Sequence, residues 1–126
     1  MSPELQTKLF ENHPKLLGSS DDGQYPRGIW GVETLDGWFD LIDTLCHVIQ
    51  HRVDSTSQPQ ISISQIKEKF GQLRFYIRGG DEYIKGLVGM AEVLSGKICE
   101  ECGRPGARKS VKGWQIVRCE QHTPPG

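Results

Sequence analysis

The sequence predicts an α+β fold in which amphipathic helices pack on a β-hairpin and a C-terminal finger of the zinc-ribbon or treble-clef-like kind completes the structure. Apolar residues recur at helical spacing within residues 35–53 and 79–97, and they alternate on both sides of a glycine within residues 61–77. The third observation is a group of candidate metal ligands, which are Cys99, Cys102, Cys119 and His122.

A single domain is expected, because 126 residues is an ordinary size for one core and no linker divides the chain. Residues 1–126 fall into three sub-regions: an N-terminal helix and loop (1–34), a helix–hairpin–helix core (35–97) and the finger (98–126). Hydrophobic residues make up 36% of the chain and recur periodically, which favours a folded protein over a disordered one.

The charge is balanced overall but divided along the chain. The formal net charge is −1, which gives no general reason to expect nucleic acid or an anionic membrane as a partner. Residues 1–60 hold four basic and nine acidic residues, a net charge of −5, whereas residues 61–126 hold eleven and seven, a net charge of +4. Such a division marks either a partner-binding face or an ordinary solvated surface.

The sequence also bears on location. The residues MSPELQTKLF show no positive start followed by an apolar run, so no secretory signal is predicted. No apolar stretch approaches the roughly 20 residues of a membrane-spanning helix. We therefore expect a cytoplasmic protein without membrane contact, in which reduced cysteines are normal. The oligomeric state does not follow from the sequence.

The first sub-region begins with a short helix in PELQTKLFENH, with Pro3 in the first turn and Pro14 as the stop. Residues 18–31 then have the composition of a loop. The strongest helix follows at residues 35–53, where Asp36 is placed to cap the start. Its apolar stripe consists of Trp38, Leu41, Ile42, Leu45, Val48 and Ile49.

Residues 61–77 predict a β-hairpin with Gly71-Gln72 as its two-residue turn, because glycine suits the first central position of a type II′ turn. This register places Phe70 opposite Leu73 on a mostly apolar side. A β-bulge near Ser64-Gln65 would bring the earlier isoleucines into phase with the later ones. The other side carries Lys67, Lys69, Arg74, Tyr76 and Arg78.

A further helix is predicted in residues 79–97, with Asp81 at its start, where a negative charge is favourable. Gly86 and Gly89 inside this helix cost about 1 kcal/mol each relative to alanine. We therefore expect another backbone to pack closely against these two glycines. The apolar face of the helix consists of Ile84, Leu87, Val88, Ala91 and Leu94.

The finger has the ligand pattern C-x2-C, then sixteen residues, then C-x2-H. Three thiolates and one imidazole suit tetrahedral zinc and leave no position for water or substrate, so structural Zn²⁺ is predicted. Gly103 suits a turn with positive φ, and ARKSVKGWQIVR predicts a hairpin that returns the second ligand pair to the first. The alternatives are unligated thiols and an iron or redox site. Disulfides fit neither a reducing compartment nor three local cysteines.

No catalytic motif is visible, and a non-enzymatic protein is expected. The chain has no nucleophile elbow, phosphate-binding Gly-Lys loop or dinucleotide fingerprint. His47 and His51 have the spacing of zinc enzymes, but Val48 stands where those enzymes carry the general-base glutamate. We interpret these histidines as part of a polar helix face. Cys46, near the apolar stripe of the same helix, is predicted to be a small core residue.

Cations on the hairpin and the finger form a candidate binding face. On the hairpin, Lys67, Lys69, Arg74 and Arg78 are suited to contact phosphates, and Tyr76 is suited to stack on a base. The finger adds Arg108, Lys109 and Lys112. One aromatic residue is a poor platform for bases, so a protein partner is the leading interpretation. Nucleic-acid binding is the second interpretation, and an ordinary solvated surface without a partner is the third.

Three stretches carry a family resemblance: VETLDGWFDLIDTLCHVIQ, IKEKFGQLRFYIRGGDEYIKGLVGMAEVLS, and CEECGRPG with GWQIVRCEQH. KEKFGQLRFY, followed by a helix and the C-x2-C-G…C-x2-H finger, resembles small zinc-finger proteins encoded by bacteriophages and prophages, over about residues 30–122. No functional residue carries over from that family. The resemblance implies a phage-type protein that binds and redirects a host protein in the host cytoplasm. Inhibition of a bacterial defence complex, such as a CRISPR effector, is one role of this kind.

Overall fold

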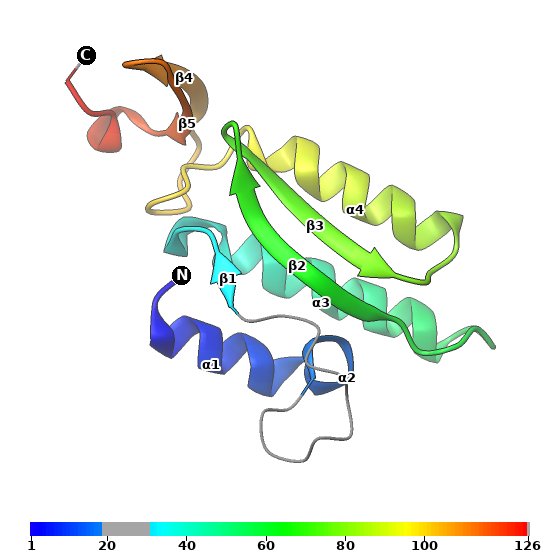
Figure 1. The fold of residues 1–126 in the computed structure, drawn as a ribbon. Helices are drawn as coiled ribbons and strands as arrows, with labels where there is room; N and C mark the ends of the chain where they lie inside the picture. The colour runs from blue at the N-terminus through cyan, green and yellow to red at the C-terminus, as the bar shows by residue number, and fades with distance from the viewer. Residues whose placement is uncertain (19–30, 126) are drawn as a thin grey trace.

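The computed structural model describes residues 1–18 and 31–125, which form a three-stranded sheet packed against helices, with a small two-stranded finger at one end (Figure 1). The strand order in the sheet is β1-β2-β3, and the finger hairpin consists of β4 and β5. The predicted α+β class is confirmed. Most of the predicted loop at 18–31 lies outside the described residues. Within the described ranges, no helix is long and apolar enough to cross a lipid bilayer.

Two short helices, α1 (Pro3–Asn12) and α2 (Pro14–Leu17), form the N-terminal part. Ser2 caps α1 by accepting a hydrogen bond from the Leu5 N–H at 3.4 Å. Pro14 ends α1 as predicted, but it also opens α2, because the fixed φ of proline suits a first helical turn. The leucines that the two helices bury in the core are Leu9, Leu16 and Leu17.

The central helix begins with a 3-10 turn (η1, Asp36–Trp38) and continues as α3 (Phe39–Asp54). The prediction that Asp36 caps α3 is wrong. Its Oδ1 instead accepts the backbone N–H of Ser2 at 2.7 Å, because η1 separates Asp36 from the α-helix. Cys46 is fully buried, in agreement with its predicted place in the core. The buried side chains of η1 and α3 are Trp38, Phe39, Ile42, Leu45, Cys46, Ile49 and Val53.

The strands β2 (Ser62–Lys69) and β3 (Gln72–Arg78) form the predicted hairpin, but the predicted turn is wrong by one residue. The turn is Phe70-Gly71, and Lys69 pairs with Gln72 across it. Both turn residues have positive φ, 54° at Phe70 and 75° at Gly71, as in a type I′ turn. This turn type matches the twist of the strands, which favours it even with a phenylalanine in a left-handed conformation.

The two faces of the hairpin are nevertheless as predicted. Moving the turn by one residue shifts the pairing by two places, and side chains alternate with a period of two, so the paired residues keep their sides and only Phe70 changes place. Ile66 pairs with Phe75 on the core side, and Lys67 pairs with Arg74 on the outer side. The predicted bulge is present at Ser64, where the register shifts.

The helix α4 (Glu82–Ser95) begins where it is predicted to begin. Asp81 caps it by accepting the Ile84 N–H at 3.0 Å. The prediction that Leu94 belongs to the buried face is wrong, because Leu94 is exposed and the next residue, Ser95, is fully buried. The buried face of α4 therefore ends on a polar side chain.

The prediction that a backbone packs closely on the glycines of α4 is also wrong for residues 1–18 and 31–125, the part that the structure describes. Gly86 and Gly89 are exposed. A Cβ atom built on either glycine would meet no atom of the described residues within 4 Å. The side of α4 that carries these glycines faces solvent.

The two sides of the β2–β3 hairpin are closed in different ways. On one side β1 (Val32–Glu33), which the sequence does not predict, pairs in parallel with β2. On the other side α4 lies along β3 (Figure 1). Ser95 Oγ accepts the Leu73 N–H at 3.0 Å, and Glu92 Oε2 accepts the Phe75 N–H at 3.0 Å. Side chains of α4 thus take the place of a further strand.

Candidate metal centre

The four predicted ligands come together in the finger. Cys99 and Cys102 follow α4, whereas Cys119 and His122 lie at the two ends of a 3-10 turn after β5. Their ligating atoms all lie within 4.8 Å of one another, and the cysteines form no disulfide. Among the residues that the structure describes, no other group of three or more Cys, His, Asp or Glu side chains is close enough to share a metal ion.

The spacing of the donor atoms fits a tetrahedral ion. The Sγ atoms of Cys102 and Cys119 lie 3.8 Å apart. His122 Nδ1 lies 3.2 Å from Cys119 Sγ and 3.9 Å from Cys99 Sγ. Tetrahedral bonds of about 2.3 Å to sulfur and about 2.0 Å to nitrogen separate two sulfurs by about 3.8 Å, and a sulfur from a nitrogen by about 3.5 Å. The observed distances lie around these values, so the four side chains are placed to hold one ion.

The first ligand pair sits on a tight backbone turn. The Gly103 N–H donates to Cys99 O at 2.9 Å, and Gly103 has a φ of 81°, the positive value that the sequence predicts. The Cys99 N–H donates to Arg104 O at 2.7 Å. These two bonds fold the chain back over the cysteines, so that both sulfurs point to the same place.

The predicted hairpin returns the second ligand pair to the first. The strands β4 (Ala107–Val111) and β5 (Trp114–Arg118) are joined by Lys112-Gly113, and both turn residues have positive φ. Cys119 follows β5 directly and precedes the 3-10 turn η2 (Glu120–His122). The order along the chain is therefore a ligand turn, a hairpin and a helical turn that carries the last two ligands.

The thiols differ in how readily they ionise. Desolvation opposes ionisation of Cys119, but hydrogen bonds from the side chain and backbone of His122 outweigh it and lower the pKa of this thiol to about 6. At Cys102 the backbone N–H of Arg104 favours the thiolate. Desolvation and the neighbouring sulfurs outweigh that hydrogen bond and raise the pKa of Cys102. The thiolate is the form that binds a metal ion, and a cation beside a thiol favours that form.

The first ligand turn is bonded to the start of the central helix. The Gly37 N–H donates to Glu100 O at 2.6 Å, and Trp38 Nε1 donates to Ile98 O at 2.9 Å. A Cβ atom at Gly37 would lie 2.5 Å from Glu100 O and closer still to Cys99 O. Only glycine allows the two backbones to approach this closely.

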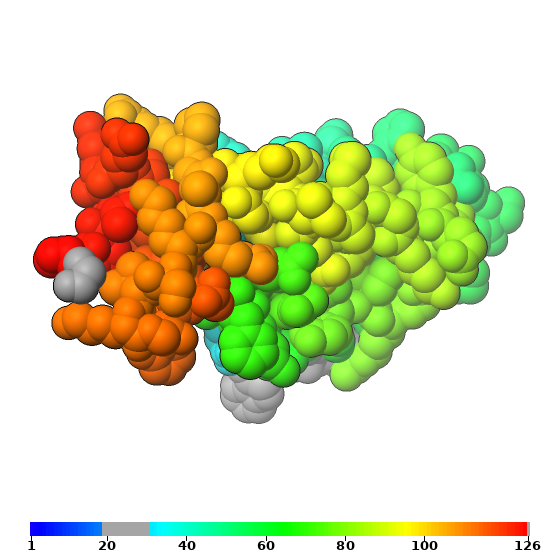
Figure 2. All heavy atoms as spheres, turned by 90° about the horizontal axis from the view of Figure 1, so that it is seen from above, coloured from blue at the N-terminus to red at the C-terminus, as the bar shows by residue number. Residues whose placement is uncertain are grey.

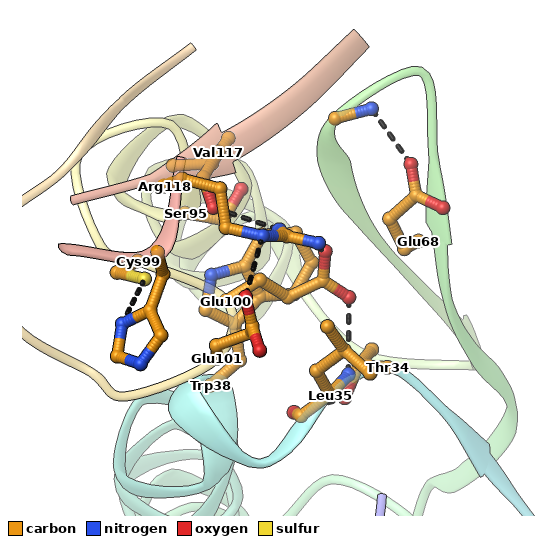
Figure 3. A network of polar contacts seen from close by, with 12 residues as sticks. Thr34, Leu35, Trp38, Glu68, Ser95, Cys99, Glu100, Glu101, Val117 and Arg118 are labelled. Carbon is orange, nitrogen blue, oxygen red and sulfur yellow. Dashed lines mark hydrogen bonds and ion pairs between the residues drawn. The ribbon is translucent and has the colours of Figure 1, made fainter. Parts of the chain in front are cut away.

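An ionic network that includes the buried Glu100 lies at the same junction (Figure 3). Glu100 Oε2 accepts the Leu35 N–H at 3.0 Å, and Glu100 Oε1 lies 3.5 Å from Arg118 Nη1. Arg118 Nε lies 3.1 Å from Glu101 Oε2, so the guanidinium is shared by two carboxylates. Desolvation raises the pKa of the Glu100 carboxyl against the lowering effect of the Leu35 hydrogen bond. No sequence pattern indicates this network, although Glu100 and Arg118 each adjoin a candidate ligand in the sequence.

The predicted binding face is divided between two parts of the structure. The outer side of the β2–β3 hairpin carries Lys67, Lys69, Arg74, Tyr76 and Arg78, all exposed or half-buried. Arg108 and Lys109 lie on β4, and Lys112 lies in the turn that follows it. Lys109 is engaged, because its Nζ donates to Thr123 Oγ1 at 2.6 Å. Binding by this face stays a prediction.

Two exposed aromatic residues were missed as candidate binding residues. Phe70 is 67% exposed and Trp114 is 76% exposed. They flank a contact between the sheet and the finger, because a Cβ atom at Gly71 would lie 3.2 Å from the backbone of Gln115. Lys69 Nζ lies 5.6 Å from the centre of the Phe70 ring. The type I′ turn explains the exposure of Phe70, which the predicted register places opposite Leu73.

The histidines of α3 take no part in the metal centre. His47 and His51 are exposed, in keeping with a polar helix face. His13, which is buried, has its Nε2 2.7 Å from Asp43 Oδ1. Desolvation raises the pKa of Asp43, but the hydrogen bonds from His13 and Asn12 outweigh it and hold that pKa below its ordinary value of 3.8.

No family model, curated protein or solved structure matches the chain, so its own residues are the guide to its function.

Proposed function

We propose that this chain is a non-enzymatic zinc-binding protein whose Zn²⁺ is structural and which acts by binding a macromolecular partner. The observation that carries the proposal is the group of four donors at the finger. Three thiolates and one imidazole are a common ligand set for structural zinc, and they leave no coordination site open for a substrate. With a ligand turn, a hairpin and a helical turn in that order, the finger is treble-clef-like.

Metal analysis tests the zinc assignment. Wild-type protein purified under reducing conditions should hold about one zinc per chain. Cys102→Ser should lose the metal, and because Cys102 is exposed its replacement disturbs little else. Cys46→Ala is the matched control, since it removes a buried cysteine outside the finger and should leave the zinc in place. Equal zinc content in Cys102→Ser and the wild type would reject the assignment.

Chelation tests the structural role of the ion. The ligand turn is bonded to η1 through Gly37 and Trp38, so loss of the ion should loosen the core as well as the finger. We expect a strong chelator to lower the melting temperature by about 10 °C or more in calorimetry. Cys102→Ser, which has no metal to lose, should show no such response. An unchanged wild-type melting curve after the zinc has been removed would refute a structural role.

The partner is proposed to be a host protein, on the strength of the resemblance to phage-encoded zinc-finger proteins. A bacterial defence complex, such as a CRISPR effector, is one target of this kind. Capture from nuclease-treated bacterial lysate tests the proposal, with Trp114→Ala as the comparison variant. A specific protein should be recovered in stoichiometric amount with the wild type and not with the variant. Recovery of nothing above background would argue against a protein partner.

Single-stranded nucleic acid is a second candidate, and the exposed aromatic residues favour it. Lys69 Nζ lies 5.6 Å from the centre of the exposed Phe70 ring, and Arg74 is on the same outer side of the hairpin as Lys69. Trp114 is a second exposed ring, on the finger. Bases stack on such rings while phosphates pair with cations. Binding of a labelled 12-nucleotide oligonucleotide should then weaken steeply between 50 and 200 mM salt. Lys69→Glu and Arg74→Glu should reduce it, and Trp114→Ala should weaken it about tenfold. Absence of binding at 50 mM salt removes this candidate.

A further inference from the structure

The solvent side of α4 has no visible role in the fold. The helix buries Ile84, Val88, Ala91 and Ser95 against α3 and β3. At 100° per residue, the opposite side carries Gly86, Gly89, Met90 and Val93. Met90 is 59% exposed and Val93 is 63% exposed. Figure 2 looks down on this part of the molecule and shows the yellow and yellow-green atoms of α4 at the surface, beside the finger.

The two glycines on this side have no local explanation. Neither has a positive φ, so neither is needed for its backbone conformation. Neither makes room for another part of the described chain, because a Cβ atom would find open space at both positions. Each lowers helix stability by about 1 kcal/mol relative to alanine. The sequence predicts a close backbone at these positions, and the described residues do not supply it.

The same side of the helix is also almost free of charge. Between Glu82 and Lys97 the charged residues are Lys85 and Glu92, and both lie at the flanks of the solvent side, although an exposed helix face is usually rich in charge. Glu92 lies toward the sheet, where its carboxylate accepts a hydrogen bond from the Phe75 N–H. Lys85 forms an ion pair with Glu82 at 3.4 Å, at the beginning of the helix. The result is an apolar stripe with an acidic residue at one end and a basic residue at the other.

We propose that α4 packs antiparallel against α4 of a second copy of this chain, about a two-fold axis between Gly89 and Met90. In this register Val93 of one chain fills the open space over Gly86 of the other, and Met90 fills the space over Gly89. The same two contacts recur on the other side of the axis, as a two-fold interface requires. Glu82 of each chain comes opposite Lys97 of its partner.

The pattern of the stripe selects a second copy over other occupants. The projecting side chains, Met90 and Val93, and the open spaces over Gly86 and Gly89 lie on the same helix. Their spacings match when two copies of the helix run antiparallel. Parallel pairing would instead set Met90 against Met90 and Glu82 against Glu82. A lipid surface would favour cations along the rim of the stripe, whereas Glu82 stands at its start.

The contact is confined to one helix of 14 residues, so the dimer should be weak. Interfaces at the low end of the size range are typical of transient association. We expect a dissociation constant on the order of 10–100 μM. The pairing involves neither the metal ligands nor the exposed aromatic residues of the finger, and it is independent of the proposed function.

Sedimentation velocity of the zinc-loaded protein between 10 and 500 μM tests the proposal. The average mass of the wild type should rise from 14.2 kDa toward twice that value as the concentration increases. Val93→Glu should stay monomeric throughout, because it places a carboxylate over a partner glycine. The matched control is Trp114→Glu, which alters an exposed apolar residue on the finger and should dimerise like the wild type.

A charge exchange tests the register. Glu82→Lys or Lys97→Glu alone brings like charges together at both ends of the stripe and should weaken the dimer about three- to tenfold. The double variant restores opposite charges and should recover wild-type affinity. A wild type that remains monomeric at 500 μM would overturn the proposal and would favour a different protein as the partner of this side of α4. Dimerisation of Val93→Glu, or failure of the double variant to recover, would overturn it as well.

Discussion

Replacing Gly37 with alanine is the sharpest test of the junction between the finger and the central helix. The new Cβ atom would lie 2.5 Å from Glu100 O and 2.6 Å from Glu100 C, where ordinary contacts begin at about 3.4 Å. Both are backbone atoms, so no side chain can rotate away. Because Cys99 O would lie closer still, the ligand turn would have to move by about 1 Å or more, which breaks the hydrogen bond from the Gly37 N–H to Glu100 O.

The expected magnitude follows from three contributions. Overpacking in a well-packed region destabilises by about 1–3 kcal/mol. The lost hydrogen bond removes about 0.5–1.5 kcal/mol. Alanine restricts the unfolded chain more than glycine does, which returns about 0.4–1 kcal/mol. The net loss of unfolding free energy in Gly37→Ala should be about 2–3 kcal/mol, or about 10 °C in melting temperature.

Urea unfolding of the zinc-loaded protein, followed by tryptophan fluorescence, measures this change. Gly86→Ala is the matched control, because it makes the same chemical change in a helix with open space around the new atom. At about 1 μM protein, where α4 pairing does not contribute, this control should gain about 0.5–1 kcal/mol. The Gly37→Ala variant should also release zinc to a chelator faster than the wild type. If Gly37→Ala lies within about 0.5 kcal/mol of the wild type, the close approach of the two backbones is not a feature of the molecule.

Three further predictions concern single side chains. Trp38→Phe keeps an aromatic ring in the core but leaves Ile98 O without its hydrogen-bond donor. Unfolding experiments should show that the free energy of unfolding falls by about 1–3 kcal/mol. Ser95→Ala leaves the buried Leu73 N–H unpaired and should lose a similar amount, with faster amide exchange at that N–H. The pKa of Asp43 is lowered in the folded state, so its stabilisation is present above about pH 4 and is lost as the pH falls through the folded pKa. Asp43→Asn should therefore show a flatter loss of stability than the wild type between pH 5 and pH 2.5.

The cluster of four candidate metal ligands was predictable because its signal is local. Two residues between ligands set each pair, and the glycine that follows the first pair marks the turn, so the four donors could be named before their positions were known. The sides of the β2–β3 hairpin were predictable for a similar reason, since alternation survives a shift of two places. The turn itself was not, because Phe70 adopts a left-handed conformation that is uncommon for an aromatic residue.

The parts that the sequence did not reveal depend on contacts between distant residues. β1 has only two residues, too few for any period, and its partner strand lies about 30 residues further along the chain. Gly37 shows no sequence signal, because its importance comes from Glu100, which lies far away in the chain. Asp36 is a residue type that often caps helices. Here a 3-10 turn separates it from the α-helix, and its carboxylate accepts a hydrogen bond from the Ser2 N–H. Local propensity therefore identified the longer helices and hairpins, whereas tertiary contacts decided the short elements and how the ends are arranged.

The way α4 covers β3 has a consequence for the order of assembly. The outer amides of β3 would normally pair with the main chain of another strand. Here they donate to the Ser95 hydroxyl and the Glu92 carboxylate, both of which belong to α4. During folding, the hairpin can form early from local contacts, but until α4 docks its outer amides are a template for strands of neighbouring molecules. Docking of α4 is thus the step that separates correct folding from self-association of the nascent sheet.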